Sequence, residues 1–286
     1  MKLSLCIITH NEEKNVHMPL DSAYDMADEV VVIDAASTDK TVQIVKKYGD
    51  KIRLYEVDNP KNFLANKERA IEKAKGEWIL QLDADEAVSP ELKKEIQSVI
   101  GQSQLQSAAI SSDKTDFNRQ PILTDSTVNG YLIPRKNWFL GRFLMKGGVY
   151  PDYVLRLYKR EGAHFELKNV HENVKVKGEV GTLKNAIEHF ADPDFERYLM
   201  RWNRYTSFDA GLLAKEKRKL NFLDFINYFL IKPKVWFFMT FFRHKGFMDG
   251  FPGFVFSLFS AIRFWAIYVK AWNLLQNKKL KTTARS

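Results

Sequence analysis

Residues 77–86 read Glu77-Trp-Ile-Leu-Gln-Leu-Asp-Ala-Asp-Glu86. The apolar run that ends at Leu82 predicts a buried strand. Asp83 and Asp85 follow it, and side chains two positions apart in an extended chain point to the same side. Two carboxylates at a strand end can hold Mg²⁺ or Mn²⁺ together with the phosphate oxygens of a substrate. The pattern alone fits a solvated turn equally well, so its neighbours along the chain decide between the two.

Three similar strand-like runs precede this stretch, at residues 3–8, 29–34 and 52–57. Helical stretches with readable ends lie between and after them, at residues 41–48, 62–75 and 90–100. Strand and helix alternating at this spacing predict an α/β fold with a doubly wound sheet. Ligands of such sheets bind at the carboxyl ends of the strands. The rule selects residues 9–12, 34–39 and 83–86 as the candidate site.

The same three segments carry a family resemblance. The chain reads I-x-T-x-N-E-E at residues 7–13, V-x-D-x-x-S-T-D-x-T at 32–41 and K-G-E-W-x-L-x-L-D-A-D-E at 75–86. These ordered motifs resemble glycosyltransferase family 2 over residues 3–95. The resemblance implies a GT-A (Rossmann-like) fold that binds a nucleotide sugar, a divalent cofactor (Mg²⁺ or Mn²⁺), and transfer with inversion at the anomeric carbon.

The rest of the chain resembles one branch of that family, the branch that includes lipopolysaccharide inner-core β-1,4-glucosyltransferases. The similar segments are residues 148–152, 155–158, 170–172 and 242–250, together with His189. This resemblance implies a UDP-sugar donor, with UDP-glucose expected, and a lipopolysaccharide-core or other lipid-linked acceptor. Alternatives are a capsule, polyprenyl-linked or protein acceptor, or a non-catalytic nucleotide-binding scaffold at the membrane.

The resemblance also implies roles for residues in the first hundred positions. Where the family often has a second acid after the one that reads the base, this chain has Ala35. The nucleoside-binding positions are Thr9, Asn11, Glu12 and Asp34; Lys67 meets the base or a phosphate; Asp83 lies near the ribose or the metal; and Asp85 is a metal ligand.

The second half is expected to supply the acceptor side. Inverting transfer needs a base on the acceptor hydroxyl, and Glu172 is the first choice, with Asp152 second. Arg156 suits a diphosphate because guanidinium binds phosphate through two hydrogen bonds. His189 is a candidate metal or diphosphate contact. For each residue a purely structural ion pair, turn or hydrogen bond is the alternative.

The charge is uneven along the chain. Residues 1–110 hold 14 Lys and Arg against 19 Asp and Glu, whereas residues 195–286 hold 17 against 5. Of the 38 aromatic residues, 18 fall between Phe222 and Trp272. A segment that is both basic and aromatic favours an anionic membrane surface over nucleic acid, and the acidic first half also argues against nucleic acid.

We therefore expect a catalytic domain over residues 1–193 and a basic, aromatic-rich helical extension over 194–286. The domain comprises a nucleotide-sugar half (1–100), a flexible loop (101–128) and an acceptor half (129–193). Alternatively, the apolar part of the extension, residues 251–269, packs on the domain, forms a dimer face or spans the membrane. The expected lipid-facing cations are Lys232, Lys234, Arg243, Lys245 and Lys270.

The single cysteine, Cys6, excludes a disulfide scaffold and suits a reducing compartment. No secretory leader is recognisable at the N-terminus, because the apolar run there ends at Thr9. We expect a cytoplasmic protein that associates peripherally with the inner face of the plasma membrane. The oligomeric state stays open.

Overall fold

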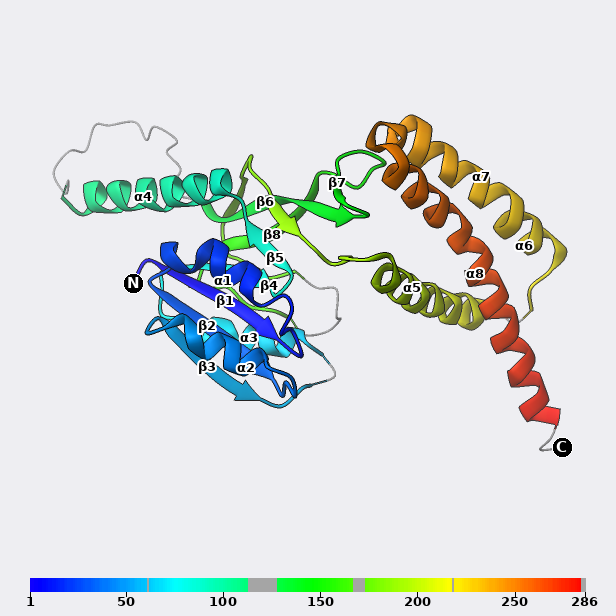
Figure 1. Ribbon diagram of the computed structural model, residues 1–286, viewed down its shortest axis with the longest axis horizontal. Helices are drawn as coiled ribbons and strands as arrows, with labels where there is room; N and C mark the ends of the chain where they lie inside the picture. The colour runs from blue at the N-terminus through cyan, green and yellow to red at the C-terminus, as the bar shows by residue number, and fades with distance from the viewer. Residues whose placement is uncertain (61, 113–127, 167–172, 218, 284–286) are drawn as a thin grey trace. The chain divides into compact units, whose positions relative to one another are not determined.

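The computed structural model describes residues 1–60, 62–112, 128–166, 173–217 and 219–283, and shows two compact units. The first, here called the sheet unit, comprises Met1–Arg135 and Asp152–His189. The second, the helical unit, comprises Lys136–Pro151 and Phe190–Ser286. Figure 1 shows the elements of each. The expected boundary between residues 193 and 194 stays a prediction about folding domains.

The first half of the sheet unit is the predicted α/β repeat. Four parallel strands lie in the order β3-β2-β1-β4. The apolar residues of β1, β2 and β4 are buried on both faces, which is why these sequence runs are continuous rather than alternating, whereas the edge strand β3 is half-buried. The strands are β1 (Leu3–Thr9), β2 (Glu29–Ala35), β3 (Ile52–Val57) and β4 (Trp78–Asp83). The α/β, GT-A-type fold class is confirmed.

The second half of the sheet continues beyond β4 in the order β8-β6-β10-β5. β8 is antiparallel to both β4 and β6, and β10 is antiparallel to β5. β7 pairs with β6 in antiparallel orientation and β9 pairs with it in parallel. This arrangement returns the chain to the end of β4, because β10 pairs with β5, the short strand that follows Asp85. The strands are β5 (Glu86–Val88), β6 (Val128–Phe139), β7 (Arg142–Leu144), β8 (Asp152–Lys159), β9 (Glu179–Thr182) and β10 (Ile187–His189).

Helices cover both faces of the parallel strands. One apolar cluster joins Leu5, Val32 and Leu80 to Leu20 of α1 and Leu92 of α4. The other joins the alternate residues Cys6, Val31 and Ile79 to Ala70 and Ile71 of α3. The helices and 3₁₀ turns are α1 (His17–Ala23), η1 (Tyr24–Met26), α2 (Thr41–Val45), η2 (Lys46–Tyr48), α3 (Leu64–Lys73) and α4 (Pro90–Ser112).

Helix α4 is longer than the sequence indicated. Residues 101–112 are helical where we expected the start of a flexible loop, and the rest of that loop, 113–127, lies outside the described residues. Gln, Ser and Ala fill this stretch, and these residues tolerate a helix once a strong N-terminus such as Ser89-Pro90-Glu91 has started it. The polar composition did not distinguish the two outcomes.

In the helical unit, α5 and the segment that contains α6 and α7 each pack against the long helix α8. Helix α5 packs on α8 through Ala210, Leu213 and Ala214, which contact Ile267 and Ala271. The intervening segment runs back along α8 and includes two π-helical turns. Its elements are α5 (Phe195–Glu216), α6 (Phe222–Ile226), η4 (Asn227–Ile231), α7 (Lys232–Phe237), η5 (Phe238–Arg243), η6 (Gly246–Asp249) and α8 (Gly250–Thr283).

The sharp turn into α8 depends on close backbone approach. A Cβ at Gly253 would lie 2.0 Å from the carbonyl oxygen of Gly246, so only glycine fits there. The buried carboxylate of Asp249 accepts hydrogen bonds from the amides of Met145 (3.0 Å) and Lys146 (2.7 Å). The turn therefore holds the strand-like segment 142–146 within the same unit.

Gly76, just before β4, provides a test of the packing between the start of β4 and the neighbouring strand β1. A Cβ there would lie 2.6 Å from Ser4 Oγ and 2.7 Å from Ser4 N. We expect Gly76→Ala to lower the free energy of unfolding by roughly 2 kcal/mol, because β1 and β4 must move apart. Gly101→Ala, with no atom near the new methyl group, should instead stabilise α4 by about 0.5–1 kcal/mol. Denaturant unfolding measures both, and equal effects would contradict the packing described.

Candidate functional site

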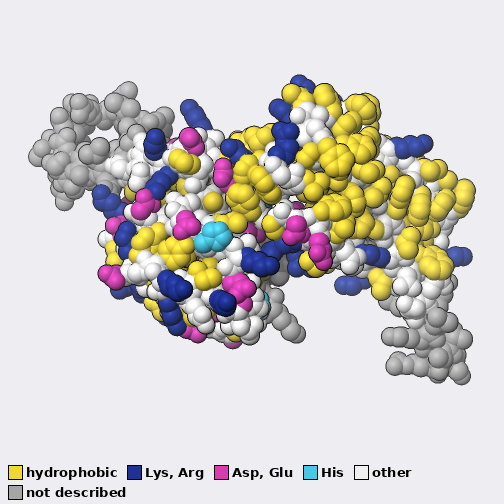
Figure 2. Space-filling view, viewed as in Figure 1, with side chains coloured by type: hydrophobic (Ala, Val, Ile, Leu, Met, Phe, Trp, Pro, Cys, Tyr) yellow, Lys and Arg dark blue, Asp and Glu magenta, His cyan; other side chains and the backbone are white. Residues whose placement is uncertain are grey.

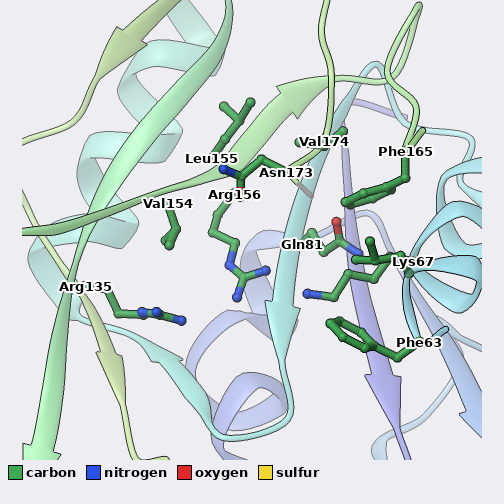
Figure 3. A pocket seen from close by; sticks show the side chains of 11 residues that line it. Phe63, Lys67, Gln81, Arg135, Val154, Leu155, Arg156, Phe165, Asn173 and Val174 are labelled. Atoms are coloured by element: carbon green, nitrogen blue, oxygen red, sulfur yellow. The ribbon is translucent and has the colours of Figure 1, made fainter. Parts of the chain in front are cut away.

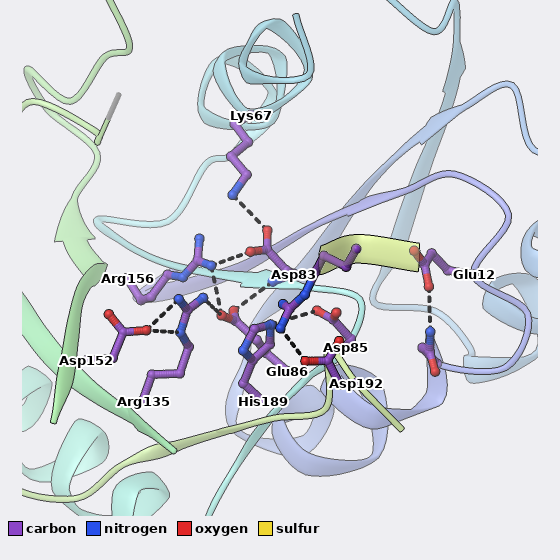
Figure 4. Close-up of polar contacts among 12 residues, drawn as sticks. Glu12, Lys67, Asp83, Asp85, Glu86, Arg135, Asp152, Arg156, His189 and Asp192 are labelled. Atoms are coloured by element: carbon purple, nitrogen blue, oxygen red, sulfur yellow. Dashed lines mark hydrogen bonds and ion pairs between the residues drawn. The ribbon is translucent and has the colours of Figure 1, made fainter. Parts of the chain in front are cut away.

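The carboxyl ends of three parallel strands meet at one edge of the sheet. Thr9 at the end of β1 lies beside Asp34 of β2, and Ile8 lies beside Asp83 at the end of β4. The residues selected from the sequence at these three strand ends are therefore neighbours. Figure 4 shows the polar side chains that gather around the end of β4.

Asp34 organises the loop after β2. Its buried carboxylate accepts hydrogen bonds from Thr9 Oγ1 (2.7 Å), Ser37 N (2.9 Å) and Ser37 Oγ (2.6 Å). These contacts join the ends of β1 and β2 and shape the loop between Asp34 and Asp39. The proposed reading of a nucleotide base by Asp34 stays a prediction.

Asn11 and Glu12 are held by the same loop. Asn11 has the left-handed backbone conformation (φ 56°) that asparagine tolerates better than most residues. Its side-chain oxygen accepts from Thr38 N at 2.8 Å, and the Glu12 amide donates to Thr41 Oγ1 at 2.8 Å. The Glu12 carboxylate accepts from Asn15 at 2.7 Å. The loops after β1 and β2 thus form one hydrogen-bonded rim.

Asp83 is paired with two cations. Lys67 Nζ of α3 lies 2.7 Å from one carboxylate oxygen, and Arg156 of β8 donates to the other. Burial alone would raise the pKa of Asp83, but the charges of Arg156 and Lys67 outweigh it and hold that pKa well below its usual range. Burial lowers the pKa of Lys67, and Asp83 opposes that shift.

Glu86 falls within the segment 83–86 selected from the sequence but was given no role there, and it lies at the centre of the cluster. Its side chain is fully buried and accepts from Arg156 Nη2 (2.8 Å), Arg135 Nη1 (3.2 Å) and the Asp83 amide (2.9 Å). A buried carboxylate needs such partners. The sequence did contain a signal for this residue, because an acid at the first position of a buried strand needs a basic partner. The sequence does not show that Arg135 and Arg156 are those partners.

Arg135, missed from the sequence, extends the cluster to Asp152. Its Nε and Nη2 atoms lie 3.0 Å and 2.6 Å from Asp152 Oδ2, and the two residues are opposite one another on β6 and β8. A continuous series of ion pairs therefore runs from α3 to β6 and β8 (Figure 4). Its members, in order, are Lys67, Asp83, Arg156, Glu86, Arg135 and Asp152.

Asp85 lies next to this series but has no such cation partner in it. Burial, followed by the negative charges of Asp83, Glu86 and Glu12, raises the pKa of Asp85 to about 7. His189 Nε2 lies 3.7 Å from Asp85 Oδ1. Burial, followed by the Arg135 charge, lowers the pKa of His189 to about 4, so this imidazole is neutral at pH 7. The neighbourhood of Asp85 thus carries excess negative charge.

These residues fit a divalent cation of the expected kind. Among the residues that the structure describes, no three His, Cys, Asp or Glu side chains are grouped closely enough to hold a metal ion unaided. Mg²⁺ and Mn²⁺ bound with a nucleotide need only one or two carboxylates, since phosphate oxygens and water complete the shell. Asp85 is the better candidate ligand, because the Asp83 oxygens are already shared between Lys67 and Arg156.

A cavity of about 260 Å³ opens beside the ion pairs, between α3, β4 and β8 (Figure 3). Its polar lining includes Lys67, Gln81 and Arg156, and its apolar lining includes Phe63 and Phe165. The site therefore offers fixed cations and a partly apolar space next to them. Glu172, our first choice for the base, lies outside the described residues.

Comparisons with known proteins agree with this picture. The family model for Glycosyl transferase family 2 matches residues 4–164. An uncharacterised glycosyltransferase of Rickettsia bellii is 30% identical over 91% of this chain and 82% of its own length. The lipopolysaccharide core biosynthesis glycosyltransferase LpsC of Rhizobium meliloti is 24% identical over 92% of this chain and 88% of its own length.

One solved structure supports the fold. The mannosyltransferase PcManGT from Pyrobaculum calidifontis, in complex with GDP-Man and Mn²⁺, matches with a TM-score of 0.51 and 15% identity, over 94% of this chain and 86% of that one. At this identity the likeness concerns the fold and not the ligands.

The excess negative charge at Asp85 predicts a pH-dependent stability. With a folded pKa of about 7 against about 3.9 when unfolded, ionisation of Asp85 destabilises the metal-free fold progressively from about pH 4, and fully above pH 7. Asp85→Asn should therefore raise the unfolding free energy by roughly 2 kcal/mol at pH 8, and by less at pH 5.

Scanning calorimetry with and without Mn²⁺ measures this effect. Mn²⁺ should raise the melting temperature of the unaltered chain and leave that of Asp85→Asn unchanged. Asp50→Asn, at an exposed acid, serves as the control and should behave like the unaltered chain. A stabilisation of Asp85→Asn by Mn²⁺ equal to that of the unaltered chain would remove Asp85 from the metal site.

Proposed function

The chain belongs to glycosyltransferase family 2, and from this premise we propose that it is a metal-dependent, inverting hexosyltransferase. Its proposed donor is UDP-glucose, and its proposed acceptor is a lipopolysaccharide core or another lipid-linked glycan. The observation that carries the proposal is the arrangement at the end of β4, where Asp85 is buried among other carboxylates while Lys67 and Arg156 are held by Asp83. A metal–diphosphate donor would bring a cation to Asp85 and phosphate oxygens to the two basic side chains.

The donor is proposed to lie along the three strand ends. Thr9, Asn11, Glu12 and Asp34 line the rim where the nucleoside would bind, and Lys67 and Arg156 are positioned for the diphosphate. These two cations are held in place by Asp83 before any ligand arrives. Because they are preorganised in a buried site, they can stabilise charge on a leaving diphosphate without a large reorganisation.

Asp85, with Asp83 and His189 nearby, would hold Mg²⁺ or Mn²⁺. When bound, the metal ion would offset the negative charge of the departing diphosphate. The neighbouring side chains restrict the orientation of the Asp85 carboxylate. Nε2 of the neutral His189 imidazole lies 3.7 Å from Asp85 Oδ1 and limits the directions in which that carboxylate can turn.

Inversion requires a base on the face of the sugar opposite the diphosphate. Glu172 is our proposed base, because it follows a strand-like segment in the acceptor half. Asp152 is the alternative, and it lies on the same strand as Arg156, at the other end of the ion-pair series. Its Oδ2 atom already accepts two hydrogen bonds from Arg135, so an acceptor hydroxyl would have to bind the remaining oxygen.

The acceptor class is proposed from the relatives. LpsC, which aligns over most of both chains, is named for lipopolysaccharide core biosynthesis. An acceptor anchored in a membrane also agrees with the helical unit, which presents a large apolar surface. Together these two points favour a lipid-linked acceptor over a soluble one.

The helical unit is proposed to bind the cytoplasmic face of the membrane peripherally. The stretch Gly246–Asn277 is long and apolar enough to span a membrane by length and composition. Within this stretch the guanidinium of Arg263 packs over two aromatic rings, with its Cζ atom 4.5 Å from the ring centroid of Trp236 and 4.9 Å from that of Phe264. Large hydrophobic side chains of this unit are exposed, among them Phe222, Phe238 and Phe251. Figure 2 shows hydrophobic side chains gathered over the unit. Such surfaces bind membrane interfaces.

The five cations that we expected to face lipid divide into two groups. Lys270 donates to Asn203, Thr206 and Ser207 of α5, and Lys232 stacks on Tyr228 at 3.8 Å, so these two cations stabilise the unit itself. Lys234, Arg243 and Lys245 are exposed and are the cations we propose for anionic headgroups.

A comparison of two variants tests the base. We expect Glu172→Gln to lower the rate of sugar transfer by roughly 10²–10⁴-fold with little change in UDP affinity, because only the proton acceptor is lost. Asp152→Asn should lower it far less. Transfer assays combined with UDP titration measure both. The reverse order of effects would make Asp152 the base.

Liposome binding tests the membrane assignment. Phe238→Glu and Phe251→Glu, at side chains 60% and 72% exposed, should each reduce co-sedimentation with anionic vesicles by about fivefold or more, because each places a charge in the apolar surface. Phe208→Glu on α5, 57% exposed, is the matched control and should bind like the unaltered chain. Equal losses in all three variants would show that the α6–α8 surface has no special role.

A further inference from the structure

The cavity beside the ion pairs contains buried hydrogen-bond donors without partners. Gln81 and Arg156 are 1% and 8% exposed, and both line the cavity (Figure 3). Gln81 Nε2 and Arg156 Nε make no hydrogen bond within the described part of the chain. A buried donor left unpaired costs folding free energy, so two of them at one cavity indicate a ligand that supplies acceptor oxygens.

The orientation of Gln81 is determined by a neighbour. The Tyr158 hydroxyl is fully buried and donates to Gln81 Oε1 at 2.7 Å. Burial raises the pKa of Tyr158 well above its usual value, so this hydroxyl keeps its proton. With Oε1 occupied by that donor, Nε2 is the free end of the amide. Gln81 Nε2 is therefore the end of the amide that is left to donate to a ligand in the cavity.

The position of the cavity indicates which part of a donor it would hold. None of the proposed nucleoside residues at the ends of β1 and β2 lines it. Lys67 and Arg156, proposed for the diphosphate, form one side, and Val154 and Leu155 of β8, the strand that begins at Asp152, form another. The group that lies between a diphosphate and an acceptor hydroxyl is the sugar being transferred.

The size and lining of the cavity also suit one sugar ring. A volume of about 260 Å³ lies just below the range of roughly 300–1,000 Å³ typical of pockets for larger ligands. Phe63 and Phe165 provide apolar surface for the C–H groups of a sugar, and Gln81 and Arg156 provide donors for its hydroxyl oxygens. The lining thus combines the two kinds of contact that a hexose needs.

We infer that this cavity is the subsite for the transferred sugar, and that Gln81 is a specificity-determining residue whose Nε2 atom donates to one hydroxyl oxygen of that sugar. This inference rests on the proposed function. Arg156 Nε is the second donor in the same subsite. A site built to hydrogen-bond a hydroxyl discriminates strongly against an analogue that lacks it, because the buried donor is then left unpaired.

Calorimetric titration of UDP and UDP-glucose, with Mn²⁺ present, tests the assignment. Gln81→Met preserves side-chain length and removes Nε2. We expect it to weaken UDP-glucose binding by roughly tenfold and to leave UDP binding unchanged. The unaltered chain should bind one monodeoxy analogue of UDP-glucose about tenfold more weakly than UDP-glucose, and Gln81→Met should cause no further loss with that analogue.

Tyr158→Phe is the matched control. It removes the same Tyr158–Gln81 hydrogen bond that Gln81→Met removes but retains Nε2. Because the amide can then turn but still donate, UDP-glucose binding should weaken by at most about threefold, well short of the loss in Gln81→Met. Equal losses in the two variants, or equal losses for UDP and UDP-glucose in Gln81→Met, would show a structural role and overturn the inference. A chain that binds neither ligand would contradict the proposed donor and, with it, this subsite. A chain that binds both, with Gln81→Met unaffected, would contradict the subsite alone.

Discussion

The buried carboxylate of Glu86 is the interaction on which the site depends. It joins Arg156, Arg135 and the backbone of Asp83, and through them it connects the parallel half of the sheet to the antiparallel half. Such a carboxylate is costly to bury unless every partner is present, so its neighbours are constrained in turn. Because Arg156 is held there, it can also meet Asp83. The result is a set of charged side chains whose positions are determined before any ligand binds.

This constraint separates two electrostatic environments within a few residues of chain. Asp83 is surrounded by cations and stays ionised, whereas the pKa of Asp85, two positions later, is raised to about 7 by burial and by the carboxylates near it. A cation beside Asp85 would lower the cost of ionising it. The proposed metal-bound diphosphate would bring such a cation to the site, next to basic side chains that Asp83 already holds in position.

The cavity adds a different kind of selectivity to that electrostatic one. Charge attracts any nucleoside diphosphate, but the donors of Gln81 and Arg156 would respond to the sugar attached to it. Tyr158 contributes without touching the ligand, because it determines which end of the Gln81 amide is free. Arg156 would contribute to both nucleotide affinity and sugar discrimination, whereas Gln81 would act on the sugar alone and could be altered without loss of nucleotide affinity.

The sequence by itself determined the parallel sheet and the position of Thr9, Asp34, Asp83 and Asp85 at or just after its strand ends, because apolar periodicity and ordered motifs are local along the chain. It included Glu86 in the candidate segment without a role and could not identify Arg135 or Gln81. The importance of these three residues arises from contacts between residues up to 77 positions apart. The length of α4 was also missed, since its polar residues suit helix and loop alike. Only tertiary structure decides such cases, because burial and pairing across strands set the energy of a polar side chain.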